Sequence, residues 1–232
     1  VAVRGAFWKL AVGNNLQINR PMYWELCAQV AERRNESEAD IHSEKHQLLH
    51  NMLKNLDIDV PRTMSRLEFF QENQPFNLPQ DMTKMMSAFI MLRPDVGYSQ
   101  PMLFVAAMLL LYMDVEDAFV CFVNLMDESR LLDFFQNKVD EIELYLSAFE
   151  ELLDAYLPKL AKHFARVGLE PRMYLFGWIM SVYSRVLPVD LASRVWDLQN
   201  ESFDHSEIIG SVRARALTEE HIEEAIDRCQ AQ

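Results

Sequence analysis

Glycine is scarce in this sequence, with 6 residues among 232, whereas soluble proteins usually contain roughly 7%. So little glycine argues against a turn-rich β-sandwich or barrel and favours helices. Long apolar runs are also missing. The longest, Met102–Met113, is far shorter than the ~20 residues that a membrane span needs, so we expect it to form a buried helix.

Cysteine is equally rare, because the sequence contains only Cys27, Cys121 and Cys229, far apart from one another. An odd and scattered set offers neither a disulfide framework nor the spacing of a zinc site, which indicates a reducing compartment. The first twenty residues contain three basic residues and no long apolar stretch, so no signal peptide is visible. The sequence begins without Met, and we expect it to be a domain of a longer chain.

Basic residues are outnumbered, with 22 Lys+Arg against 35 Asp+Glu and a net charge of −13. Nucleic acids and anionic membranes bind clustered Lys and Arg, so we expect no nucleic-acid partner and no direct membrane insertion. Half of the residues are apolar, which excludes disorder for most of the chain and suffices for a packed core.

Helical periodicity runs through almost the whole sequence and predicts an all-α, multi-helix fold. The expected helices cover residues 21–34, 41–56, 81–92, 101–112, 115–126, 133–156, 158–167, 173–186, 191–198 and 218–229. The polar residues 35–40 predict a loop. The stretch 57–79 contains three prolines and no clear periodicity, which predicts an extended connection. Long irregular segments of this kind are often functional.

Two short motifs lie in this connection and shortly after it. The first reads L-D-I-D-V-P-R and ends at Arg62, with Asp59 three residues earlier; the second reads Y-S-Q and runs from Tyr98 to Gln100. In this order they resemble the I-x-x-D-x-x-R and Y-x-Q motifs of the TBC domain, the helical GTPase-activating module for Rab-type small GTPases. A leucine stands where the family has isoleucine.

Three further segments extend the resemblance over about residues 1–197. Arg4 and Trp8 match the family's R-x-x-x-W entry motif, and R-P-D-V-G leads into Tyr98 as it does in one TBC subgroup. Residues 187–197 resemble the later segment L-P-x-x-x-x-x-R-[IV]-W-D. Arginines beside aromatic residues in a helical core usually pack, so we expect structural roles for Arg4, Trp8, Arg194 and Trp196.

The resemblance sets the expected domain boundaries. We predict a TBC-like Rab-GAP domain over residues 1–197 and an acidic C-terminal segment over residues 198–232. After residue 197 the family continues with a long apolar helical segment, which this sequence lacks, so we expect a shortened or incomplete C-terminal lobe. The resemblance also implies a cytoplasmic domain, peripheral to endomembranes through its partners or through regions outside this segment.

The resemblance implies an activator that supplies catalytic residues in trans, and not a hydrolase by itself. Its partner would be a Rab-family small GTPase in its GTP form. Arg62 would be the arginine finger, because a guanidinium is a permanently charged fork suited to phosphate oxygens. Gln100 would orient the attacking water through its amide, with Asp59 and Tyr98 in support.

No cofactor or metal of its own is implied, because GTP and Mg²⁺ are carried by the partner. The sequence contains no P-loop. The stretch 61–101 holds four basic and four acidic residues, so the acidic excess lies elsewhere, largely around residues 141–154 and in the C-terminal segment.

Departures from the family pattern keep a second function open. The family usually continues its arginine motif as R-T-F-P, whereas Met64 and Ser65 follow Thr63 here, and Pro101 stands where Y-C-Q-G-M has glycine. The alternative is a non-catalytic TBC module that acts as a Rab effector or scaffold. A helical interaction domain unrelated to GTPases is a third possibility.

Other patterns favour structural explanations. His42, His46 and His50 recur at a spacing that could place imidazoles on one helix face, but no obvious further ligand accompanies them, and we interpret them as a partly exposed flank. The acidic run over residues 141–154 is best explained as a solvated helix face. Taken alone, Arg62 could be a solvated loop residue in a weak surface ion pair.

Overall fold

The computed structural model of the chain describes residues 2–35, 43–65, 67, 70, 77–127 and 129–201. No strand occurs within these ranges, and the predicted all-α fold is confirmed. The helices are α1 (Ala2–Val12), α2 (Arg20–Arg34), α3 (Glu44–Asp59), α4 (Leu78–Leu92), α5 (Pro101–Leu110), α6 (Val115–Asp127), α7 (Ser129–Phe135), α8 (Val139–Tyr156), α9 (Pro158–Val167), α10 (Pro171–Met180) and α11 (Val189–Glu201). A short 3-10 turn, η2 (Val60–Arg62), follows α3.

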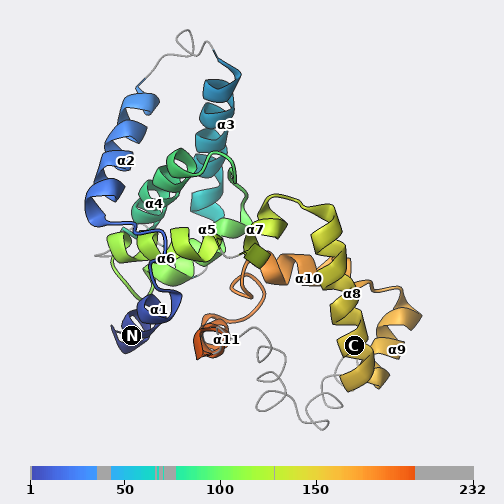
Figure 1. The fold of residues 1–232 in the computed structure, drawn as a ribbon. Helices are drawn as coiled ribbons and strands as arrows, with labels where there is room; N and C mark the ends of the chain where they lie inside the picture. Colours follow the sequence, from blue (N-terminus) through green and yellow to red (C-terminus); the bar gives the residue numbers. More distant parts are fainter. Residues whose placement is uncertain are drawn as a thin grey trace.

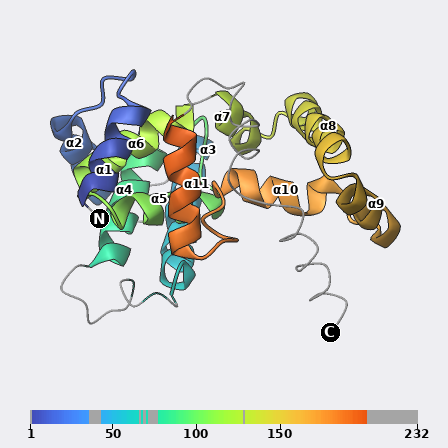
Figure 2. The same cartoon turned by 90° about the horizontal axis from the view of Figure 1, so that it is seen from below.

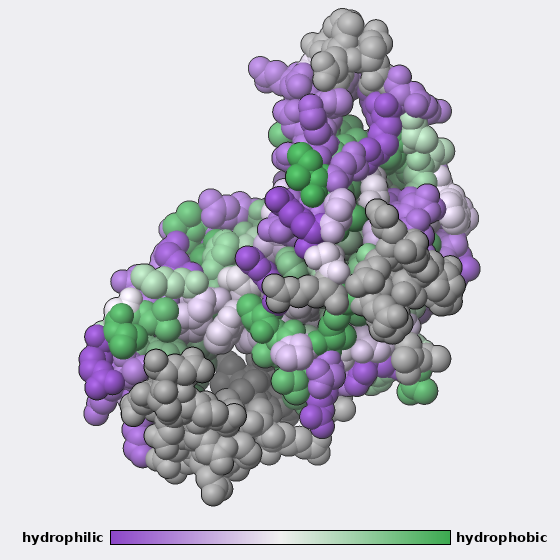
Figure 3. All heavy atoms as spheres, turned by 180° about the vertical axis from the view of Figure 1, so that it is seen from behind, coloured by the Kyte–Doolittle hydropathy of each residue, from purple (hydrophilic) through white to green (hydrophobic). Residues whose placement is uncertain are grey.

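The helices form two groups that lie side by side (Figure 1). Helices α1 to α6 make the first group, and α7 to α10 make the second. The chain then returns, and α11 packs against α1 (Figure 2). The ends of α2 and α3 project from the first group, and their surface is mostly hydrophilic in the view from behind (Figure 3).

Helix α5 lies at the centre of the larger core. Its residues are buried apart from Pro101 and Phe104, which are half-buried. Helices α4 and α6 pack against it and contribute fully buried side chains such as Phe89 and Phe122, whose rings meet edge to face with centroids 5.0 Å apart. The prediction of a buried helix in this apolar run is therefore confirmed. No helix among the described residues combines the length and the apolarity that crossing a bilayer requires.

The second group of helices has a smaller core of its own. It is formed by side chains from α7, α8 and α10, namely Phe134, Ile142, Leu146, Leu175 and Met180. Helix α9 has the predicted bounds. Pro158 lies in its first turn, and Gly168 adopts a left-handed conformation (φ 70°) just past its end. This arrangement confirms the sequence reading of that helix.

The single helix predicted over residues 133–156 is wrong, because a turn separates α7 from α8. Asn137 has a left-handed backbone (φ 54°), which asparagine tolerates better than most residues. The Lys138 ammonium donates to the Asp133 carboxylate across the turn at 2.7 Å. Apolar residues on both sides of the break face the same small core, and the helical spacing therefore continues through it.

The connection predicted over residues 57–79 is shorter than expected. Helix α3 continues to Asp59, because buried Leu53, Leu56 and Val60 extend its apolar face to the point where Pro61 ends the α-helix. At the other end Pro79 belongs to the first turn of α4, whose N-cap Asn77 accepts a hydrogen bond from the backbone N–H of Gln80.

Several other predicted boundaries also change. Helix α10 ends at Met180, six residues before the predicted end, and a tight turn follows it. Helix α1 was not expected at all, since Val3 and Leu10 are 84% and 82% exposed and blur its apolar periodicity. Helix α11, predicted over residues 191–198, runs from Val189 to Glu201. Residues 36–40 of the predicted loop and the helix predicted over residues 218–229 lie outside the described residues.

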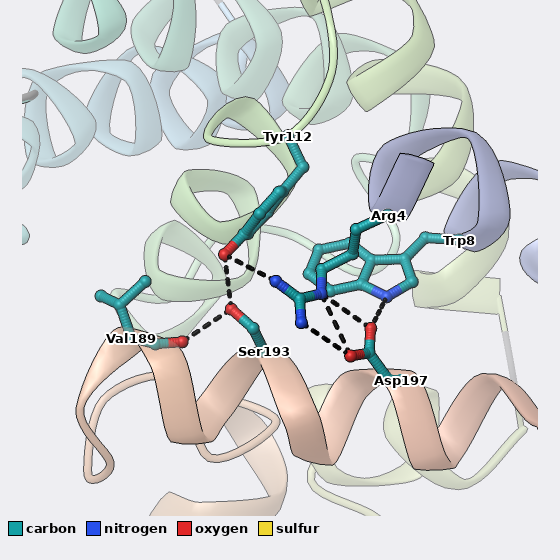
Figure 4. Close-up of polar contacts among 6 residues, drawn as sticks. All are labelled: Arg4, Trp8, Tyr112, Val189, Ser193 and Asp197. Carbon is teal, nitrogen blue, oxygen red and sulfur yellow. Dashed lines mark hydrogen bonds and ion pairs between the residues drawn. The ribbon is translucent and has the colours of Figure 1, made fainter. Parts of the chain in front are cut away.

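The entry motif and the late W-D segment meet at one carboxylate, Asp197 (Figure 4). The Arg4 guanidinium donates to Asp197 from Nε at 2.9 Å and from Nη2 at 2.9 Å, and the Trp8 indole donates to its Oδ1 at 2.9 Å. These contacts join the first helix to the last described one, across 193 positions of sequence for Arg4.

The end of α5 belongs to the same network. The Ser193 hydroxyl donates to the Val189 carbonyl at 2.6 Å, and therefore accepts from the Tyr112 hydroxyl at 2.8 Å (Figure 4). The Arg4 guanidinium also reaches the Tyr112 hydroxyl at 3.4 Å. The structural roles predicted for Arg4, Trp8 and Trp196 are confirmed, since the Trp8 and Trp196 rings also pack with centroids 4.9 Å apart. Arg194 is instead exposed on α11.

A substitution at Gly5 tests how tightly α1 packs on the end of α5. A Cβ atom at Gly5 would lie 2.2 Å from the Tyr112 carbonyl oxygen, so we expect Gly5→Ala to lower the free energy of unfolding by about 1–3 kcal/mol. Gly177 in α10 is the matched control, because nothing lies within 4 Å of its Cβ position. Gly177→Ala should raise stability by about 0.5–1 kcal/mol. Urea unfolding followed by circular dichroism measures both, and equal effects would contradict the close approach.

Candidate functional site

Asp59 is fixed in place by the end of α3. Leu56 and Val60, on either side of it, are 0% and 3% exposed and hold the segment against the core. Pro61 forces the chain into the 3-10 turn η2, which the Thr63 N–H closes by donating to the Val60 carbonyl at 3.0 Å. The Thr63 hydroxyl also donates to the Asp59 carbonyl at 2.9 Å. Asp59 and Arg62 therefore lie on a well-defined turn, and not in an irregular stretch.

The Asp59 carboxylate joins the two sequence motifs. Its Oδ1 accepts from Arg62 Nη2, and its Oδ2 accepts from the Tyr98 hydroxyl at 2.8 Å. Asp59 is only 7% exposed, and a buried carboxylate needs such partners because its desolvation is costly. The structure thus brings Asp59, Arg62 and Tyr98 together, although 39 positions separate Asp59 from Tyr98.

Arg62 is held at one end of its guanidinium and open at the other. Its side chain is 62% exposed, and the contact with Asp59 uses a single nitrogen. A guanidinium carries five N–H donors in a rigid fork. The remaining donors of Arg62 can therefore bind an incoming oxyanion while Asp59 keeps the side chain oriented.

The turn before Tyr98 is built by Arg93 and Gly97. The N–H groups of Val96 and Gly97 both donate to the Arg93 carbonyl at 3.1 Å. Gly97 has φ 74°, and a Cβ there would lie 3.2 Å from Met52 Cε, so a larger residue would be both strained and crowded. This turn directs the following residues back toward α3.

The Arg93 side chain braces the same turn with two carboxylates. It donates to Asp95 from Nε at 2.9 Å and to Asp127 from Nη1 at 2.8 Å. The hydrogen bond from Arg93 is the main reason why the pKa of Asp95 is lowered. Sequence patterns alone assign no role to Arg93 within R-P-D-V-G, although its two-residue spacing from Asp95 permits this ion pair.

The Tyr98 hydroxyl donates a hydrogen bond to Asp59 and stays protonated. Burial raises the pKa of Tyr98, and the hydrogen bond to the Asp59 carboxylate raises it further. Thr63 and Tyr98 therefore hold Asp59 from two sides. Sequence patterns alone assign no role to Thr63, although its position four residues after Asp59 permits a hydroxyl bond back to that carbonyl.

Gln100 lies at the beginning of α5, half-buried, with helical backbone angles (φ −54°, ψ −39°). Its side chain does not cap the helix, and its carbonyl accepts from the Leu103 N–H at 3.0 Å. Pro101 occupies the first helical position, where the missing N–H would have no intrahelical partner. The carboxamide of Gln100 is thus not used in helix capping and can serve a ligand.

The departure from the family pattern after Thr63 has a local structural consequence. Met64, after Arg62 and Thr63, has a left-handed backbone (φ 50°) and is half-buried against the large core. Thr63 is 1% exposed. The Thr63 and Met64 side chains thus turn toward the protein, whereas Pro61, Arg62 and Ser65 are exposed.

The described residues contain no group of three or more His, Cys, Asp or Glu side chains that could hold a metal ion. His46 and His50 are half-buried on α3, as predicted for a helix flank. His42, the first member of that pattern, lies outside the described residues.

Comparison with known proteins adds to this geometry. The family model described as "Rab-GTPase-TBC domain" matches residues 2–212. TBC1 domain family member 12 of Xenopus tropicalis is 36% identical over 204 residues, which cover 85% of this chain and 30% of that protein. TBC1 domain family member 14 of Homo sapiens is 36% identical over 206 residues, covering 85% and 29%. The chain therefore spans about a third or less of the length of these curated relatives.

Solved structures with the same fold are more distant in sequence. The Chlamydomonas flagellar RabGAP TBC domain superposes with a TM-score of 0.68 at 18% identity, covering 89% of this chain and 63% of that one. The Ypt/Rab-GAP domain of Gyp1p superposes with a TM-score of 0.61 at 17% identity, covering 89% and 70%. At these identities the likeness concerns the fold.

The bond between Tyr98 and Asp59 can be tested by stability. We expect Tyr98→Phe to lower the free energy of unfolding by about 1.5–3 kcal/mol, the range for a hydrogen bond to a charged group. Tyr174→Phe is the matched control, because the buried Tyr174 hydroxyl has no hydrogen-bond partner among the described residues, and its loss should be neutral or slightly stabilising. Urea unfolding measures both variants. A Tyr98→Phe protein as stable as the control would show that this bond does not join the two motifs.

Proposed function

Since the chain belongs to the Rab-GTPase-TBC domain family, we propose that it accelerates GTP hydrolysis by a Rab-family small GTPase. It does so by supplying an arginine and a glutamine in trans to a partner in its GTP form. The observation that supports this proposal is the bridging of Arg62 and Tyr98 by the Asp59 carboxylate, because it links the segment of the arginine motif to the segment that carries Gln100.

Arg62 acts as the arginine finger. Hydrolysis of GTP leaves little covalent work for a protein, and catalysis consists mainly of positioning and of neutralising charge on the transferring phosphoryl group. The exposed donors of Arg62 can bind phosphate oxygens with the geometry of a planar fork. Such a finger contributes on the order of 10³–10⁵ in rate.

Gln100 orients the attacking water. An amide side chain both donates and accepts hydrogen bonds, which is what holding a water molecule in line with the phosphoryl group requires. Its place at the start of a helix packed into the core keeps its position nearly fixed. Rigid placement matters because near-attack geometry requires reacting atoms within about 3–3.5 Å of each other.

Asp59 and Tyr98 are positioning residues. Asp59 holds Arg62 in the orientation from which it enters the partner, and Tyr98 ties the segment that carries Gln100 to the same carboxylate. The chain itself contributes no nucleotide-binding loop, so GTP and Mg²⁺ belong to the partner.

A panel of GTP-loaded Rab proteins in single-turnover hydrolysis tests the proposal. At least one Rab should be stimulated by the wild-type chain. Arg62→Ala should then lower the stimulated rate by about 10³-fold or more, and Gln100→Ala by about 10²–10³-fold, the cost of removing one oriented polar group. Arg62→Lys should recover little, since an ammonium lacks the planar fork.

Arg166→Ala is the matched control, because Arg166 lies on α9, which packs on α8 in the second group of helices. It should keep full activity. Stimulation that survives both the Arg62 and the Gln100 substitutions would contradict the proposed fingers. Binding to GTP-loaded Rab without any stimulation would favour instead a non-catalytic effector or scaffold, the reading that Pro101, Met64 and Ser65 left open.

A further inference from the structure

Two residues of α5 that follow Gln100 keep accessible surface. In α5, all of whose residues the structure describes, only Pro101 and Phe104 are not buried. Phe104 lies four positions after Gln100, and residues at this spacing share one helix face. A partner that approaches Gln100 therefore meets whatever covers Phe104.

Phe104 is covered by Arg185. The Arg185 guanidinium carbon lies 5.9 Å from the centroid of the Phe104 ring, within the range of a cation–π contact. Arg185 is exposed. Among the residues that the structure describes, no carboxylate is paired with it. A guanidinium that stacks by its face keeps its N–H edges free to donate.

The turn that carries Arg185 is strained. Val182 and Tyr183 have left-handed backbones (φ 45° and 60°), a conformation that is a genuine outlier for a β-branched residue such as valine. Each such residue costs about 1–3 kcal/mol and persists only where the surroundings enforce it. Strain of this kind often accompanies residues that must be presented in one place.

Trp196 enforces this turn from the core. Its indole nitrogen donates to the Val182 carbonyl at 3.0 Å and contacts the Ser184 hydroxyl at 3.1 Å, and the ring is 3% exposed. The Tyr183 N–H closes the turn on the Trp178 carbonyl at 2.8 Å. The tryptophan of the late W-D segment thus holds the backbone that projects Arg185 over α5.

We propose that Arg185 is a second cationic contact for the partner GTPase. It binds a carboxylate on the surface of the partner, beside the partner's nucleotide site. A carboxylate of the partner fits better than the nucleotide itself, because four residues of helix separate Phe104 from Gln100 by about 6 Å. That offset is larger than the near-attack distance at the phosphoryl group. The stacked guanidinium can bind a carboxylate through two parallel N–H donors.

This inference rests on the proposed function but makes a different kinetic prediction. Exposed charges at the rim of an interface mainly change the association rate and its salt dependence. Arg185 should therefore act on kcat/KM, whereas Arg62 and Gln100 should act on kcat.

The experiment uses a Rab that the wild-type chain stimulates and compares Arg185→Gln with Arg166→Gln, which removes the same charge from α9. At low ionic strength Arg185→Gln should lower kcat/KM by about fivefold, the ratio expected for loss of one exposed ion pair. Its kcat at saturating Rab should be unchanged. The deficit should shrink at about 0.5 M salt, where exposed charges are screened. Arg185→Lys should restore part of the loss, and Arg166→Gln should match the wild type.

The outcomes separate the two proposals. A wild-type chain that neither binds nor stimulates any Rab contradicts the proposed function, and with it this inference. An active wild type with equal kcat/KM for Arg185→Gln and Arg166→Gln overturns the inference alone. A loss confined to kcat would also overturn it, since it would assign Arg185 to the reacting phosphoryl group. Circular dichroism confirms that each variant is folded.

Discussion

The burial of α5 is the constraint on which the rest of the structure depends. Eight of its ten residues are buried, and α4 and α6 pack against it. A helix enclosed in this way, with only Pro101 and Phe104 half-buried, cannot shift without opening a void in a close-packed core. Its two ends are therefore fixed points of the fold. Gln100 lies at one end and Tyr112 follows the other, so the position of the glutamine depends on the packing of the whole first group of helices.

Each end of α5 is tied to the fold by an aspartate that accepts from one arginine and one aromatic donor. Asp197 engages Arg4 through two nitrogens, and a third reaches Tyr112. Asp59 engages Arg62 through one nitrogen only, and that side chain is 62% exposed. Both aspartates accept hydrogen bonds from an arginine, but the two arginines differ in how many N–H donors remain available to a partner. Arg4 has used its donors to hold α1 in place, whereas Arg62 is oriented and still has donors to offer, which separates a structural arginine from a candidate finger.

Sequence patterns predicted the helical class, the buried helix α5 and the bounds of α9, because apolar periodicity and terminal residues act locally. They did not predict the break at Asn137, because the apolar spacing continues through it. They also did not predict the early end of α10, because tertiary hydrogen bonds from Trp196 impose the turn that follows it. At the candidate site, the motifs named Asp59 and Arg62. The bond from Tyr98 to Asp59 spans 39 positions, and no local pattern specifies which oxygen of a carboxylate serves which partner.

The effect of the molecule's net negative charge on a partner depends on how far the charged residues lie from the contact surface. A net charge of −13 opposes the approach of any anionic surface, but at physiological ionic strength fields from exposed charges fade over about 8 Å. Beyond that range the acidic residues around α8 exert little influence on the surface at the start of α5. Among the described residues, Arg62, restrained by Asp59, and Arg185, stacked on Phe104, are exposed cations held by contacts to this part of the fold. Local pairing therefore decides what this surface attracts. Asp59, which is already bonded, orients Arg62, whereas Arg185, which pairs with no carboxylate among the described residues, attracts an acidic group.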